Sequence, residues 1–153
     1  MASQVPQLSF HCIQAPGITR QFLEAHWPSS LPLRIEAPQN RYAFMKSCEV
    51  ILAASGTATL ECALAGTPTV VAYKLSPVSG FLARLVLNVE FVSLPNLILG
   101  QEVFPELLQK NAKADLIAEN ARTWLQNEQA RLACKQELKK LRVLLGTGNA
   151  PQT

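Results

Sequence analysis

Apolar and polar positions form two kinds of segment along the first hundred residues. Short, mostly apolar runs are typical of strands, and they occur at 8–13, 33–37, 49–54, 68–73 and 90–94. Segments with apolar residues at helical spacing lie between them, at 17–27, 40–48, 58–65 and 77–87. The continuous runs 49–54 and 68–73 predict strands that are buried on both faces.

Strands that alternate with helices at this spacing predict βαβ units. Because such crossovers are right-handed, the units should form one open parallel sheet with helices on both faces. The expected fold is therefore α/β and Rossmann-like. We assign residues 1–112 to this domain, 113–146 to C-terminal helices and 147–153 to a flexible tail.

The C-terminal helices have clear sequence signals. Asp115 is the expected N-cap of the first helix, and the second should run over about 128–145. Four apolar residues share one face of the second helix: Cys134, Leu138, Leu141 and Leu145. This stripe could pack on its own domain or on a partner subunit, and the sequence leaves both alternatives open.

Composition narrows the class of protein. The 153 residues are 48% hydrophobic and 16% charged, which excludes a disordered polar chain. A net charge of +3 is too small to indicate nucleic-acid binding, and the basic groups at 129–142 are expected on a solvated helix face. Residues 50–73 carry one charge, but glycines and a proline interrupt them, so we do not expect a membrane span there.

Cysteine and histidine usage argues against a metal site. None of the four cysteines is spaced C-x-x-C, and His11 and His26 have no ligand partner at a useful spacing. Each histidine is expected in the core or at the surface. The free thiols and the absence of a secretory signal in the N-terminal residues favour a reducing cytosol.

The main candidate site follows the strand predicted at 49–54. Its residues are Ser55, Gly56, Thr57, Ala58, Thr59 and Glu61. Ligands of open parallel sheets bind beyond the carboxyl ends of strands, and a following helix N-terminus suits a phosphate. Glu61, one turn after Thr57, could accept hydrogen bonds from sugar hydroxyls. The alternative is a plain joint, with Ser55 or Thr57 as the N-cap and Glu61 solvated.

A second candidate is Asn96 in the segment SLPNLILG. Pro95 and Gly100 predict a fixed loop after a strand, which would bring the Asn96 amide to the same sheet edge as Gly56. The alternative is a turn residue bonded to its own backbone.

The segments ILAASGTATLECALAGTPTVVAYKLSP and VSLPNLILGQEVFPELLQ resemble the C-terminal part of bacterial lipid-A-disaccharide synthases. These are glycosyltransferases of the GT-B type, built from two Rossmann-like domains. The resemblance covers roughly residues 45–125, with the motifs in the same order. It implies that this chain is an incomplete C-terminal domain of that architecture.

The resemblance also implies a reaction. 2,3-Diacylglucosamine passes from UDP-2,3-diacylglucosamine to 2,3-diacylglucosamine 1-phosphate, which gives lipid A disaccharide 1-phosphate and UDP without a metal or cofactor. Residues 55–59 would border the UDP pyrophosphate, Glu61 would lie near the ribose, and Asn96 would be the catalytic asparagine. The family further implies a cytoplasmic location, peripheral at the inner face of the inner membrane, and a homodimer formed through C-terminal elements.

This chain departs from the family pattern at its start. From the resemblance, we expect the chain to lack the family's N-terminal domain, and with it the expected base and most of the lipid acceptor site. We therefore expect the chain to carry the UDP-sugar donor side only and to be inactive alone. Two alternatives remain: a non-catalytic nucleotide-binding or assembly module derived from that enzyme, and another UDP-sugar enzyme of the same architecture.

Overall fold

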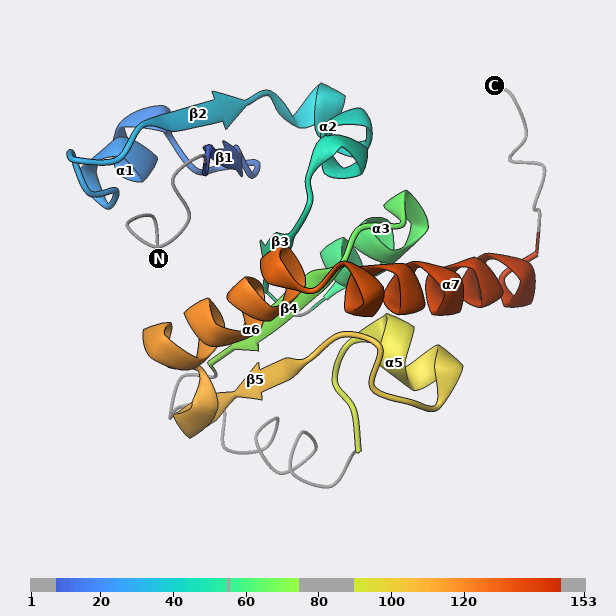
Figure 1. Ribbon diagram of the computed structural model, residues 1–153. Helices are drawn as coiled ribbons and strands as arrows, with labels where there is room; N and C mark the ends of the chain where they lie inside the picture. Colours follow the sequence, from blue (N-terminus) through green and yellow to red (C-terminus); the bar gives the residue numbers. More distant parts are fainter. Residues whose placement is uncertain (1–7, 55, 75–89, 147–153) are drawn as a thin grey trace, which may run out of the picture. The chain divides into compact units, whose positions relative to one another are not determined.

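The computed structural model describes residues 8–54, 56–74 and 90–146 (Figure 1). The chain divides into two compact units, Met1–Ser47 and Cys48–Thr153, and each is treated by itself. The helix predicted at 77–87 and the tail predicted at 147–153 lie outside the described residues. Within the described ranges, no helix combines the length and the apolar character needed to cross a membrane.

The first unit is a small α/β arrangement whose two strands run parallel. Its elements are β1 (Phe10–Ile13), α1 (Arg20–Ala25), β2 (Leu33–Glu36), the short 3-10 helix η2 (Pro38–Asn40) and α2 (Arg41–Ser47). Phe10 lies opposite Leu33 and Ile13 opposite Glu36. The Thr19 side chain accepts a hydrogen bond from the Phe22 N–H and so caps α1. The strands and helices predicted before residue 48 are confirmed.

The second unit holds a three-stranded parallel sheet in the order β3–β4–β5. Its elements are β3 (Ile51–Ala53), α3 (Thr57–Ala65), β4 (Thr69–Tyr73), α5 (Leu94–Leu99), β5 (Glu106–Leu108), the 3-10 helix η4 (Gln109–Asn111), α6 (Ala114–Gln126) and α7 (Glu128–Leu144). The α/β class and the parallel pairing are confirmed. The described strands pair in two groups, however, whereas the sequence predicted one sheet.

The two strands that were predicted to be buried on both faces differ in their exposure. In β4, Val70 and Val71 have no exposed surface, as expected for the central strand. In β3, Leu52 remains 56% exposed, so the prediction of burial on both faces is wrong there. Among the described residues, β3 is an edge strand that pairs with β4 alone, so its side chains have same-face neighbours on one side only.

The segment after residue 90 differs most from the prediction. No strand forms at 90–94, and SLPNLILG is a helix, α5, instead of a fixed loop. Pro95 lies in the first turn of α5, where its missing N–H costs nothing and its fixed φ suits a helix. The third strand of the sheet is β5, whose three residues are too few to show an alternating pattern.

Helix α6 begins earlier than predicted. Its N-cap is Lys113, so Asp115 is a first-turn residue and the N-cap prediction is wrong. A carboxylate at that position still interacts favourably with the positive end of the helix dipole. The Arg131 guanidinium of α7 donates to the carbonyl oxygens of Trp124 and Leu125, and it thereby fixes the joint between the two helices.

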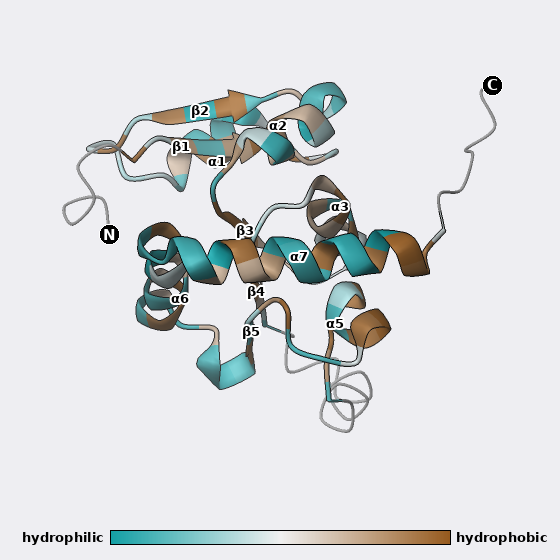
Figure 2. Cartoon of the chain, turned by 45° about the vertical axis from the view of Figure 1, so that its right-hand side comes forward, coloured by the Kyte–Doolittle hydropathy of each residue, from teal (hydrophilic) through white to brown (hydrophobic). Residues whose placement is uncertain are grey.

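Helix α7 buries most of its predicted stripe within its own unit. Cys134, Leu138 and Leu141 are buried, while Leu145 is 44% exposed. The helix packs against α3, α5 and α6, which favours the alternative that the stripe covers its own domain. Figure 2 shows the helix alternating between hydrophilic and hydrophobic colours, with a hydrophobic C-terminal end. That end carries exposed Val143 and Leu144.

The four cysteines are all free thiols, and they differ in burial, so we expect them to differ in reactivity. Burial raises the pKa of the Cys62 thiol to about 11 and that of Cys134 to about 12. Thiolate is the reactive form, and about a thousandth of Cys62 would be ionised at pH 8. We expect iodoacetamide to label half-buried Cys12 and Cys48 first and to spare Cys62 and Cys134, as peptide mass spectrometry would show.

The matched control for the labelling experiment is the same chain in concentrated urea. All four cysteines should then react at similar rates, because unfolding removes the burial that separates them. If Cys62 or Cys134 reacted in the folded chain as fast as Cys48, the packing of α3 and α7 described here would be contradicted.

Candidate functional site

The bend between β3 and α3 has a backbone conformation that requires glycine. Gly56 has φ 127° and ψ −162°, a combination that residues with a Cβ scarcely populate. Gly56 is the N-cap of α3, so the alternative with Ser55 or Thr57 in that position is wrong. Ser55 itself lies outside the described residues. Since glycine has no side-chain oxygen, Gly56 cannot accept hydrogen bonds from the first-turn N–H groups as Ser or Asp would.

Thr59 supports this bend from inside. Its hydroxyl donates to the Gly56 carbonyl oxygen at 2.7 Å, and its backbone N–H donates to the same oxygen at 3.1 Å. Thr59 has no exposed surface, whereas Gly56, Thr57 and Ala58 are exposed. The predicted group thus divides into an exposed first turn and a buried threonine that holds it.

Glu61 lies one turn beyond Thr57 in α3 and is half-buried. Residues four apart share a face of a helix, so Glu61 follows the exposed turn along one side of α3. Its charge also contributes to the raised pKa of the neighbouring Cys62 thiol, after the larger effect of burial. This position on α3 is the one that the sequence predicted for Glu61.

Asn96 occupies a very different environment from the one predicted. It lies in α5 with no exposed surface. Its Oδ1 accepts hydrogen bonds from the N–H groups of Val103 at 2.9 Å and Phe104 at 3.0 Å. Its Nδ2 donates to the Phe104 carbonyl oxygen at 2.7 Å and to Glu106 Oε1 at 2.9 Å. The prediction of an amide presented by a loop is wrong.

The strand register separates Asn96 from the bend. Ala53 lies opposite Val71, and Val71 lies opposite Glu106, so Glu106 is level with the last residue of β3. Gly56 comes three residues beyond that level, while the partners of Asn96 in the segment before β5 come below it. This register does not support the expectation that Asn96 and Gly56 share one sheet edge.

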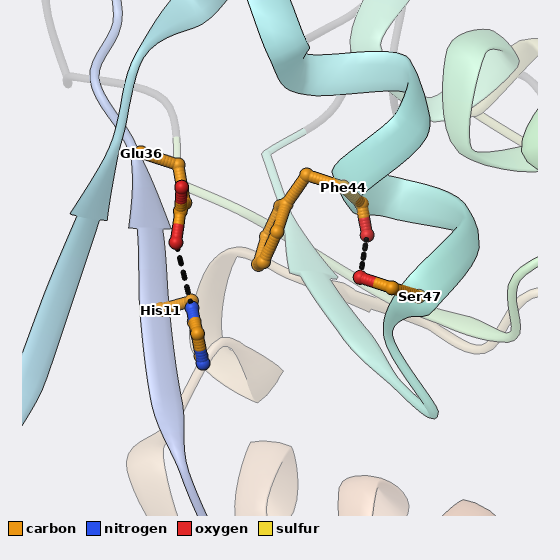
Figure 3. Close-up of polar contacts among 4 residues, drawn as sticks. All are labelled: His11, Glu36, Phe44 and Ser47. Carbon is orange, nitrogen blue, oxygen red and sulfur yellow. Dashed lines mark hydrogen bonds and ion pairs between the residues drawn. The ribbon is translucent and has the colours of Figure 1, made fainter.

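A polar pair in the first unit went unnoticed in the sequence. His11 Nδ1 lies 3.1 Å from Glu36 Oε1, and the Phe44 ring lies beside the imidazole with centroids 5.0 Å apart (Figure 3). Both side chains of the pair are partly exposed. Only the register of β1 and β2 could have predicted this contact. His11 and Ile13 share a face of β1, and Glu36 lies opposite Ile13.

The described histidines, cysteines and carboxylates form no metal site. His26 ends α1, with Nδ1 2.8 Å from the Phe22 carbonyl oxygen. Across the described ranges, no three His, Cys, Asp or Glu side chains come together in a way that could hold a metal ion. The exposed first turn of α3, with Glu61 beside it, is thus the strongest candidate site among the described residues.

Comparison with known proteins gives one consistent result. A family model described as lipid-A-disaccharide synthetase matches residues 1–150. The chain is 40% identical to a lipid-A-disaccharide synthase of Nitrosococcus oceani over 118 residues, which are 77% of this chain and 30% of that protein. A second such synthase, from Chromohalobacter salexigens, is 35% identical over 151 residues, or 97% of this chain and 39% of that protein.

A third relative with the same name, from Trichlorobacter lovleyi, is 36% identical over 127 residues, which are 82% of this chain and 33% of that protein. The chain therefore spans about a third of the length of the curated relatives it matches.

Proposed function

The chain belongs to the lipid-A-disaccharide synthase family, and from this membership we propose that it supplies the UDP-sugar donor side of that glycosyl transfer. The donor would be UDP-2,3-diacylglucosamine and the acceptor 2,3-diacylglucosamine 1-phosphate. The products would be lipid A disaccharide 1-phosphate and UDP. The chain spans about a third of the length of its relatives, and we assign only the donor side to it.

The exposed first turn of α3 is the observation that carries this proposal. Gly56 lets the diphosphate approach the backbone closely, and the N–H groups of Thr57 and Ala58 lie at the positive end of the helix dipole. A diphosphate there would be bound by backbone donors. Thr59 would act indirectly, because its buried hydroxyl holds the Gly56 carbonyl.

Glu61 would complete the nucleotide site by accepting hydrogen bonds from the ribose hydroxyls. Its position one turn along the same face of α3 supports this role. Two neighbouring hydroxyls can each donate to one carboxylate oxygen, which fixes the sugar relative to the diphosphate.

The proposed chemistry is a displacement at the anomeric carbon of the donor. The acceptor hydroxyl oxygen forms the new bond to that carbon, its proton passes to a general base, and the bond to UDP breaks. The electron pair of the broken bond goes to the β-phosphate of UDP. The N–H groups of the α3 N-terminus would stabilise the charge that develops there. The base belongs to the acceptor side in this proposal.

Partners and location follow from the same membership. We assign to the chain a homodimer formed through the C-terminal helices and a peripheral association with the cytoplasmic face of the inner membrane. Exposed apolar side chains on α7 support the first assignment: Leu132, Val143 and Leu144. The alternative of an assembly module without catalysis rests on the same side chains and predicts no affinity for UDP.

Calorimetric titration with UDP tests the proposal. We expect weak binding, still weaker binding of UMP because it lacks the second phosphate, and a roughly tenfold higher Kd for UDP after Glu61→Ala. The matched control is Glu119→Ala, which removes an exposed carboxylate from α6 and should leave the Kd unchanged. Equal affinity for UDP and UMP, or no heat with either, would contradict the site.

A further inference from the structure

A buried polar cluster joins the start of α5 to the start of β5. At its centre, the Glu106 carboxylate accepts three hydrogen bonds from groups far away in the sequence. The donors are the Val92 N–H at 2.7 Å, the Ser93 N–H at 2.8 Å and the Asn96 Nδ2 at 2.9 Å. One half-buried carboxylate thus ties the segment before α5 to the first residue of β5.

Asn96 completes the cluster from the helix side. A primary amide can accept two hydrogen bonds and donate two, and Asn96 makes all four within the chain. Its partners are the backbone of Val103 and Phe104 and the carboxylate of Glu106. A sugar nucleotide could bind this amide only by displacing one of these bonds in a site without exposed surface.

We propose that Asn96 and Glu106 are a positioning pair, which holds α5 and β5 together and does not touch substrate. The effect on the donor site passes through packing, because α5 packs against α3 and α3 carries the Gly56 turn. The functional half of this inference rests on the proposed function. The structural half, the coupling of the two side chains, stands on the hydrogen bonds alone.

The coupling can be measured without any ligand. Asn96→Asp keeps the acceptor for the two backbone N–H groups but places a second carboxylate against Glu106. In urea unfolding at pH 7.5, we expect the folded-to-unfolded ratio to fall on the order of 10- to 100-fold. Adding Glu106→Gln supplies a donor to the new carboxylate, and we expect the double variant to recover about tenfold of that loss.

The pH profile identifies the cause of this loss. Two carboxylates in contact repel each other only while both are ionised, and lowering the pH neutralises carboxylates. The deficit of Asn96→Asp relative to the wild type should therefore shrink with falling pH, and Glu106→Gln should abolish that dependence. Two results would contradict the coupling of Asn96 and Glu106. One is that the fold-losses of the two single variants multiply in the double variant, and the other is that the deficit of Asn96→Asp does not change with pH.

Ser93→Ala is the matched control in the same cluster. The Ser93 hydroxyl is buried and has no hydrogen-bond partner among the described residues. Its removal leaves the bond from the Ser93 N–H to Glu106 in place. We expect no loss of stability from this variant. A loss as large as that of Asn96→Asp would show that any substitution in the cluster disrupts the fold. That result would overturn the specific role of Asn96 and Glu106.

NMR titration with UDP tests the functional half. The side-chain amide pair of Asn96 is identified as the one missing from the spectrum of Asn96→Asp. At saturating UDP, we expect the backbone amides of Gly56 and Thr57 to shift and this pair to keep its position. If the pair shifts as far as the Gly56 amide, Asn96 contacts the nucleotide and the inference is overturned. If no signal shifts, the proposed function fails, while the unfolding experiments still decide the pair.

Discussion

Leu141→Ala is expected to lower the free energy of unfolding by about 2–5 kcal/mol, the usual cost of truncating a large buried aliphatic side chain. Leu141 has no exposed surface and belongs to the buried stripe of α7 with Cys134 and Leu138. The helix packs against α3, α5 and α6, so a cavity here would loosen several elements together. Urea denaturation followed by circular dichroism measures the loss.

Val143→Ala is the matched control for this prediction. It truncates another aliphatic residue of α7, two positions along, whose surface is 77% exposed. Removing exposed atoms creates no cavity, so at a protein concentration too low for dimers the free energy of unfolding should change by no more than about 0.5 kcal/mol. Equal losses for the two variants would contradict the assignment of the stripe as the buried face of α7. They would mean that the exposed side of the helix contributes as much to the free energy of unfolding.

The features that the sequence predicted correctly are encoded locally. The apolar stripe of α7 repeats at helical spacing over residues 134–145, and α3 ends at Ala65 as predicted, where Gly66 takes the left-handed conformation that glycine favours. Strand β4 is a continuous apolar run in the centre of its sheet. The bend at Gly56 was predicted for the same reason. A glycine between an apolar run and a helical segment is a signal that lies within a few adjacent residues.

The features that were missed depend on partners distant in the sequence. Strand β5 has three residues and is defined by its pairing with β4, which no local pattern reports. Pro95 suggests a loop as readily as a first helical turn, and only packing decides between them. The contact between His11 and Glu36 spans 25 positions and requires the register of β1 and β2.

Asn96 shows the same limit at the level of a single side chain. Sequence and family resemblance both indicated that this residue matters, and neither could say what its amide touches. Its partners lie seven to ten residues ahead, in a segment whose strand was not predicted. In the proposal made above, such a residue acts on a site that it does not reach, because it fixes the elements that carry the site.

Gly56→Asn is the second large expected effect, with a loss of about 1–3 kcal/mol in the free energy of unfolding. A Cβ at Gly56 would meet no atom within 4 Å, so the cost comes from the backbone conformation and not from a clash. Relaxing φ from 127° would turn the Gly56 carbonyl away from the Thr59 hydroxyl. Because the N–H groups that would bind the diphosphate follow directly, UDP affinity should fall as well.

Gly100→Asn separates this effect from the general cost of replacing a glycine at positive φ. Gly100 ends α5 with φ 63° and ψ 25°, the left-handed region that asparagine also adopts, and it too has open space at its Cβ. We expect this variant to lose less than about 1 kcal/mol and to keep its UDP affinity. Urea unfolding and UDP titration of both variants test this prediction. If Gly56→Asn lost no more stability or affinity than Gly100→Asn, the bend would tolerate a side chain. The open glycine turn would then not be what shapes the donor site.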